Sequence, residues 1–209
     1  HWDRPYRDAF IPATRVPGSW DRGYVQSVGG ICTVVGDQLR FYYIGFKGGD
    51  SSSYMHSNGA TGMATLRRDG FASMSTTGEG SLTTHPVKFS GKYMFVNVNC
   101  PAGELKVEIL DKNNKVIDGF SADKCKAVTI DSTIQQVEWN GASDLSSLAG
   151  QEVRFRFKLK NGDLYAFWVS PSTNGESNGY VAGGGPGYTS NKDTEGKKAY
   201  EKASGFQKF

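Results

Sequence analysis

The chain has 209 residues, with 27 glycines, 12% aromatic residues and a formal net charge of +3 at neutral pH. This length can bury a substantial core in one or two domains, and the mildly basic charge permits an acidic partner without requiring one. The sequence has no polybasic arm and no apolar run near the ~18 residues that span a bilayer, so we expect neither a nucleic acid nor a membrane as partner.

Residues 1–47 consist of short extended pieces separated by proline and glycine. We predict a strand over residues 20–25 and a hairpin over residues 31–44 with its turn at Gly36-Asp37. About four short strands in this length match the size of one propeller blade, and a lone blade cannot bury both of its faces. We therefore expect residues 1–47 to be a propeller-blade remnant that packs on the domain after it. Because the chain opens at His1 without methionine or a signal segment, we expect a processed product or a fragment.

Residues 48–60 are polar and rich in glycine and serine, which predicts a linker. Residues 61–170 then carry about ten short strands and no long helix, with one helical turn expected after Asp144. This pattern predicts an all-β fold, an antiparallel two-sheet β-sandwich of jelly-roll or concanavalin-like type. Residues 171–209 lose the pattern and are expected to form an irregular tail with, at most, a short surface helix over residues 197–202.

The most regular alternation lies in residues 153–160, where apolar residues alternate with arginine and lysine. Asn161-Gly162 follows, and then a second apolar run over residues 163–169. Asn-Gly between two such runs predicts a two-residue hairpin, because a type I′ turn needs positive φ at both central residues. In that register Lys158 faces Tyr165 and Arg156 faces Phe167.

This predicted hairpin face has two interpretations. Half-buried strands need polar side chains on their wet side, and the stems of arginine and lysine cover apolar surface well. Alternatively, the face is a platform for a polyanion, with Tyr165 and Phe167 stacking on rings while Arg154, Arg156 and Lys158 bind sulfate or carboxylate. The sequence leaves both open.

Other candidate binding residues have similar alternatives. Arg67 and Arg68 form either an anion clamp or a turn with a local ion pair to Asp69. Aromatic residues in loops, rather than in the core, are candidates for stacking on sugars. They are Tyr54, Tyr180 and Tyr188.

The sequence supplies no recognisable catalytic set. Retaining glycosidases need two carboxylates ~5 Å apart, and nothing pairs Asp3, Asp21 or Asp37 in this way. No serine lies in a nucleophile elbow, so we expect no enzyme activity from this chain. We expect no cofactor, although a structural calcium held by backbone carbonyls stays open. A disulfide between Cys100 and Cys125 is one alternative, and three buried thiols, with Cys32, are the other.

Several phrases, in this order, resemble one family. They are Pro17-Gly-Ser-Trp-Asp21, Gly36-Asp37 before Phe41-Tyr-Tyr43, residues 64–71 (ATLRRDGF), residues 103–108 (GELKVE), Gly119-Phe-Ser121 with Asp123 and Cys125, Trp139-Asn-Gly with Ser143-Asp-Leu, and residues 164–168 (LYAFW). Together they resemble the C-terminal part of bacterial family-32-like glycosidases of the invertase and fructan-hydrolase clan. The resemblance covers most of residues 1–185.

This resemblance implies a last propeller blade over residues 1–47 and an appended sandwich from about residue 60. In that family the catalytic carboxylates lie on earlier blades, which are absent here. It also implies that Trp20 and Asp21 approach a sugar pocket at the propeller mouth.

We therefore predict a non-catalytic carbohydrate-binding β-sandwich of a secreted or periplasmic glycosidase, attached to the catalytic propeller domain of the parent protein. The cationic strand favours an acidic or sulfated, algal-type polysaccharide as ligand. The alternative is a structural sandwich that braces the propeller and binds no sugar.

Overall fold

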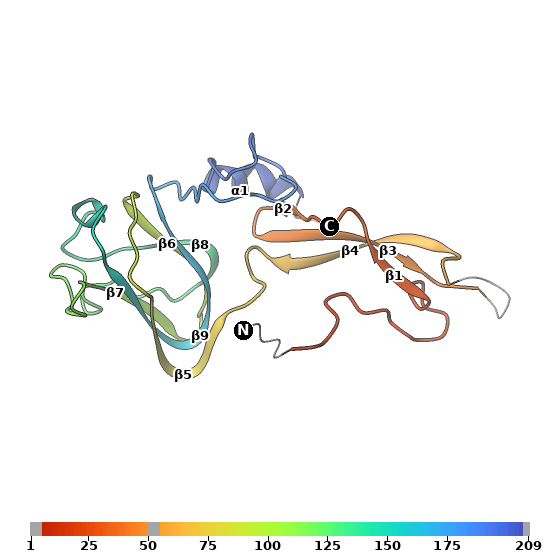
Figure 1. Cartoon of the computed structure of the whole chain (residues 1–209), viewed down its shortest axis with the longest axis horizontal. Helices are drawn as coiled ribbons and strands as arrows, with labels where there is room; N and C mark the ends of the chain where they lie inside the picture. Colours follow the sequence, from red (N-terminus) through yellow and green to blue (C-terminus); the bar gives the residue numbers. More distant parts are fainter. Residues whose placement is uncertain (1–5, 50–54, 207–209) are drawn as a thin grey trace. The chain divides into compact units, whose positions relative to one another are not determined.

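The computed structural model describes residues 6–49 and 55–206, and in them the fold is all-β with antiparallel sheets (Figure 1). The predicted class of an all-β, antiparallel two-sheet sandwich is therefore confirmed. The strands are β1 Tyr24–Ser27, β2 Thr33–Val35, β3 Gln38–Phe46, β4 Gly59–Arg67, β5 Met74–Thr83, β6 Tyr93–Asn99, β7 Glu104–Leu110, β8 Asp131–Val137 and β9 Arg154–Ser170. The helical elements are η1 Ser146–Leu148, α1 Lys197–Ala203 and η2 Ser204–Phe206. The chain divides into two compact units, residues 1–33 with 39–66 and residues 34–38 with 67–209.

The first sheet has the order β1-β3-β2, and β4 also pairs with β3. Residues 59–66 thus belong to the first unit, whereas the sequence analysis placed the sandwich from residue 61 onward. Two glycines of β4 explain the pairing. A side chain at Gly62 would meet the rings of Trp20 and Tyr43, and one at Gly59 would meet the ring of Phe46. Glycine here makes room for aromatic packing that lies far away in the sequence.

The second sheet depends on β9, which is a single strand of 17 residues. The predicted hairpin at Asn161-Gly162 is wrong. Residues 154–160 pair with β7, residues 163–170 pair with β6, and β5 spans the junction from Thr83↔Arg156 to Met74↔Leu164. Each half of β9 therefore pairs with distant strands instead of with the other half.

Asn161 and Gly162 still have a conformational role, because they mark a bend in β9. Asn161 has a φ of 43°, in the left-handed region that asparagine tolerates better than most residues. Gly162 packs so tightly that a Cβ there would lie 2.6 Å from both the carbonyl oxygen of Asn99 and the Cβ of Cys100. The Asn-Gly pair thus supplies backbone freedom for a bend, rather than for a turn.

Ring contacts show how strongly β9 bends. Phe157 and Phe167 are ten residues apart, which is roughly 33 Å along a straight strand. Their ring centroids are 4.9 Å apart, and Phe155 also contacts Phe167 at 5.7 Å. The two halves of β9 therefore face each other across the core, as the curved strand in Figure 1 indicates. One strand contributes to both layers, with the bend as the corner.

The core of the second unit lies between these layers. Most of its fully buried side chains come from β6, β7 and β9, with Leu145 and Val153 from the segment before β9, and the loops after β7 and β8 add aromatic residues. The largest are Met94, Val96, Val98, Leu105, Val107, Ile109, Leu145, Val153, Phe155 and Phe157. Trp139 joins them, and its indole nitrogen donates to the carbonyl oxygen of Val107 at 2.8 Å.

The irregular tail packs on the second unit. Val181, Ala199 and Ala203 are buried, and the amide of Val34 donates to the carbonyl oxygen of Gly184 at 2.8 Å. A helix forms close to the predicted range, over α1. The tail thus contributes buried surface despite its lack of a sequence pattern.

We expect Gly162→Ala to destabilise the protein by about 1–3 kcal/mol, because the added methyl group must displace backbone atoms at the bend. Gly78→Ala is the matched control, since no atom lies within 4 Å of a Cβ built there. Urea unfolding followed by circular dichroism measures both variants. Equal midpoints for the two variants would contradict the tight packing at the bend.

Candidate functional site

The cationic residues of β9 lie on the outer face of the sheet formed by β5, β9 and β7. In register, Glu104 lies opposite Lys160, Lys106 opposite Lys158 and Glu108 opposite Arg156. On the other side of β9, Glu79 lies opposite Lys160. We call this surface the charged face. It carries both signs of charge, because the neighbours of β9 bring carboxylates to the strand.

Glu108 is the centre of the charged face. Its side chain is only 6% exposed, and it accepts a hydrogen bond from Arg156 at 2.8 Å and pairs with Lys158 at 3.3 Å. A buried carboxylate requires such partners. Two of the three predicted anion-binding cations are therefore already paired with a carboxylate of β7. The third, Arg154, donates to the carbonyl oxygen of Thr84 at 3.1 Å.

Glu108 was not among the predicted site residues, because the predicted hairpin placed residues 163–169, rather than β7, beside residues 154–160. The alternation in residues 104–110 was visible, and it does place Glu104, Lys106 and Glu108 on one face. Only the pairing of β7 with β9 brings this face beside the arginine and lysine side chains.

The predicted aromatic residues are not part of the charged face. Phe167 packs against Phe155 and Phe157, toward the core. Tyr165 lies under the guanidinium group of Arg67, with 4.7 Å between the Arg67 Cζ atom and the ring centre. The bend of β9 separates both rings from Arg156, so the predicted platform of alternating rings and cations does not form.

Arg67 is held by structural contacts. Its guanidinium group donates to the Asn97 side chain at 2.7 Å, to the carbonyl oxygen of Val98 at 3.0 Å and to the carboxylate of Asp131. With Tyr165 beneath it, this side chain ties the start of the second unit to β6 and β8.

Arg68 is buried and contacts residues of the C-terminal tail. It pairs with Asp193 at 2.9 Å, where both side chains are less than 10% exposed, and only loosely with Asp69 at 3.7 Å. Its guanidinium group also lies over the rings of Tyr188 and Tyr200. Burial raises the pKa of both tyrosines, which keeps these phenols neutral. The predicted turn at Arg67–Gly70 is present, since the amide of Gly70 donates to the carbonyl oxygen of Arg67. The main ionic partner of Arg68, however, is Asp193, which is distant in the sequence, rather than Asp69.

Trp20 and Asp21 lie together in the first unit. Trp20 is 40% exposed and stacks beside Tyr43 at 5.6 Å, over the surface that Gly45 and Gly62 leave open. Asp21 is buried and accepts a hydrogen bond from the hydroxyl of Thr14 at 2.6 Å. Of this pair, the indole is therefore the group open to a ligand.

The remaining loop aromatics have different environments. Tyr180 is exposed beside Lys192, while Tyr188 is covered at Arg68. Tyr54 and Asp3 lie outside the described residues. Among residues 6–49 and 55–206, no group of three or more histidine, cysteine or acidic side chains is arranged to hold a metal ion. In the same residues no helix is long and apolar enough to cross a membrane.

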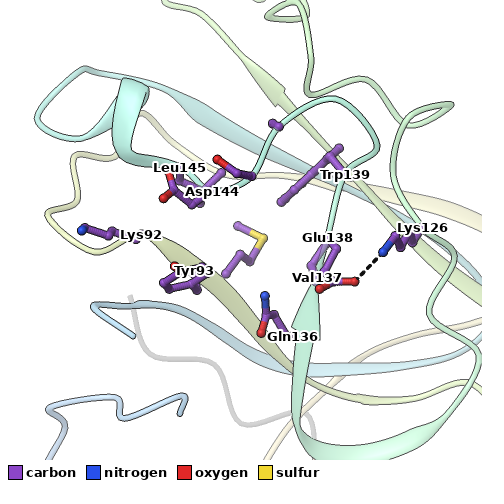
Figure 2. A pocket seen from close by; sticks show the side chains of 12 residues that line it. Lys92, Tyr93, Lys126, Gln136, Val137, Glu138, Trp139, Asp144 and Leu145 are labelled. Carbon is purple, nitrogen blue, oxygen red and sulfur yellow. Dashed lines mark hydrogen bonds and ion pairs between the residues drawn. The ribbon is translucent and has the colours of Figure 1, made fainter. Parts of the chain in front are cut away.

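Among the hollows in the part of the chain that the structure describes, two are each lined by four or more charged side chains. The first is an open groove of about 580 Å³ on the charged face. Its polar lining is Glu79, Ser81, Glu104, Lys106, Asp123, Lys158 and Lys160. The second is a smaller, more enclosed pocket of about 210 Å³ beside β6 and β8 (Figure 2).

The lysine side chains of the groove form long, exposed ion pairs that an anionic ligand can replace. Lys160 pairs with Glu79 and Lys106 pairs with Glu104, each at 3.7 Å and with side chains more than a third exposed. Such exposed pairs contribute little to stability, so a ligand can replace them at low cost. Lys106 and Lys158 lie directly opposite each other on neighbouring strands, an arrangement of like charges that favours an anion between them.

Comparison with protein-family models, with curated proteins and with solved structures found no match for this chain.

We expect Arg68→Ala to lower the free energy of unfolding by about 3–5 kcal/mol, because it leaves Asp193 buried without its counter-charge. Arg68→Met combined with Asp193→Asn should cost less, since asparagine keeps the acceptor for the amide of Gly196 without a buried charge. Lys124→Ala removes an exposed ion pair and is the control. A double variant less stable than Arg68→Ala would contradict this account.

Cys100 and Cys125 are buried free thiols, so the predicted alternative of a Cys100–Cys125 disulfide is wrong, and Cys32 is buried as well. Burial raises the pKa of both of these thiols. The folded state therefore keeps protons that the unfolded chain releases from about pH 8.5, and the free energy of unfolding should fall as the pH rises above that value.

We expect a disulfide-exchange reagent to label Cys100 and Cys125 at about pH 8 only after unfolding in urea. Absorbance of the released thiolate measures the labelling. Rapid labelling of either thiol in the native protein would show that it is accessible.

Proposed function

We propose that this chain is a non-catalytic carbohydrate-binding β-sandwich whose ligand is a polysaccharide with acidic or sulfated groups. The observation that carries the proposal is the opposed pair of Lys106 and Lys158 in an open groove. One sulfate or carboxylate of the polymer would lie between their ammonium groups. In this proposal the chain is an accessory part of a secreted or periplasmic glycosidase and adjoins its catalytic propeller.

The rest of the groove suits hydroxyl groups. Glu79, Glu104 and Asp123 offer acceptors, Ser81 offers a hydroxyl and Lys160 offers a donor. The carboxylates would repel a densely sulfated chain, because every lysine of the groove has an acidic neighbour. The arrangement therefore favours a polymer with spaced anionic groups and free hydroxyls between them. An open groove also allows such a chain to extend past either end.

A second candidate is a structural role in a larger protein, and the rings of the first unit favour it. Tyr24 and Phe46 each contact the ring of His56, with centroids 4.9 and 5.4 Å apart. Tyr24 is also more than a third exposed, as are Trp20 and Tyr42. Exposed apolar clusters are typical of surfaces that another protein covers. In this role the chain would brace a neighbouring domain and bind no sugar.

Affinity electrophoresis against neutral, carboxylated and sulfated polysaccharides tests the proposal. We expect at least one anionic polymer to retard the protein at low salt, and moderate salt to relieve the retardation, because salt screens exposed charges. Lys106→Ala should reduce retardation a few-fold, since single exposed contacts contribute about 0–1 kcal/mol. Arg156→Ala is unsuitable as a test, because it removes one of the two cations that pair with the buried carboxylate of Glu108. A loss of binding in this variant could then reflect a loss of stability.

Lys115→Ala is the matched control for this assay, because Lys115 is an exposed lysine in a turn outside the groove. Retardation of both variants to the same degree would exclude the lysine pair as the binding site. If no polymer retards the unmodified protein, the bracing role replaces the proposal.

A further inference from the structure

The pocket in Figure 2 lies between the start of β6, the end of β8 and the loop over residues 142–145. Its apolar lining comes from Met94, Val137, Trp139 and Leu145, side chains that also belong to the core. Its polar lining is Lys92, Tyr93, Lys126, Gln136, Glu138, Ser143 and Asp144. An apolar base with several convergent polar groups is typical of a small-molecule site.

The polar groups of this pocket supply both donors and acceptors. Lys126 and Glu138 form an ion pair at 2.8 Å with both side chains about half exposed, so the pair is open to a ligand. Across the pocket, Asp144 accepts the amide hydrogen of Ser146 at 2.8 Å. This hydrogen bond, together with the nearby Lys92, lowers the pKa of the Asp144 carboxyl group and keeps it an acceptor. Figure 2 shows Asp144 and Tyr93 on one side and Glu138 on the other.

A second hollow adjoins this pocket along β8. It measures about 250 Å³ and is lined by residues 126–130 together with Gln135, Gln136 and Glu138. Lys126, Gln136 and Glu138 line both hollows. The Lys126–Glu138 ion pair therefore lies at the junction of two neighbouring spaces of similar size.

We propose that these two hollows form a second carbohydrate site, which binds two consecutive sugar units of a neutral oligosaccharide. Sugar hydroxyls donate and accept at once, so they match walls that present ammonium, carboxylate, amide and phenol groups together. A ligand with only one sign of charge would be repelled by two of the four charged side chains that line the pocket of Figure 2. This site lies outside the groove, and it rests on the proposed function only for the class of ligand.

Two conservative substitutions test the site in the full chain. Glu138→Gln removes the charge of one acceptor, and Asp144→Asn does the same while keeping the side-chain oxygen that caps Ser146. Glu152→Gln, at an exposed position outside both hollows, is the matched control. The probes are linear gluco-, galacto-, manno- and fructo-oligosaccharides of about four units, which exceeds the two units proposed.

Nuclear magnetic resonance titration with ¹⁵N-labelled protein gives the readout. We expect at least one probe to shift the amide signals of Lys126, Gln136, Glu138 and Leu145. Glu138→Gln and Asp144→Asn should each weaken that binding by about tenfold, because hydrogen bonds to charged groups are among the stronger ones. Glu152→Gln should leave it unchanged.

The inference is overturned if no probe shifts these signals, or if the two pocket variants bind as tightly as Glu152→Gln. It is also overturned if the signals that move belong only to Lys106, Lys158 and Lys160, because the ligand then occupies the groove alone. The proposal for the groove is tested separately: it fails if polysaccharides retard the Lys106→Ala variant as much as the unmodified protein. The two proposals can therefore fail independently.

Discussion

The second unit depends on the bend in β9. A strand of 17 residues would extend beyond a small domain if it stayed straight, and each half would bury only one face. The bend brings Phe167 onto Phe155 and Phe157, so a single strand closes the core from both layers. Backbone freedom at Asn161 and the missing side chain at Gly162 make this geometry accessible. Pairing with β5, β6 and β7 then holds it in place.

The same bend decides the chemistry of the surface. Because residues 154–160 pair with β7, the cations of β9 meet Glu104 and Glu108 rather than the aromatic rings of the second half. Glu108 pairs with both Arg156 and Lys158 from a nearly buried position, and its single negative charge balances only one of these two cations. What remains for a ligand is a groove of mixed charge with one pair of opposed lysines. A surface of this kind discriminates by the spacing of charges along a ligand, because attraction and repulsion alternate within a few ångströms.

Adjacent arginines at the start of the second unit perform two different structural tasks. Arg67 bonds to β6 and β8, while Arg68 pairs with Asp193 of the tail and lies over Tyr188 and Tyr200. Burying a guanidinium group is costly unless its charge is paired, and Asp193 of the tail supplies the counter-charge. The segment without a recognisable pattern is thus held by a specific electrostatic contact. Both arginines are therefore explained by stability, without a ligand.

Period-two alternation is a local property of a strand, so the all-β class and the positions of most strands can be predicted from the residues alone. The same holds for the outward orientation of the charged residues in residues 104–110 and 154–160. The Asn161-Gly162 pair also indicates a point of unusual backbone conformation. Long-range contacts, in contrast, make this point a bend and bring Glu108 beside Arg156 and Asp193 beside Arg68. These contacts join residues 48 and 125 positions apart. They follow from which strands pair and where the tail packs, and local preference does not encode either choice.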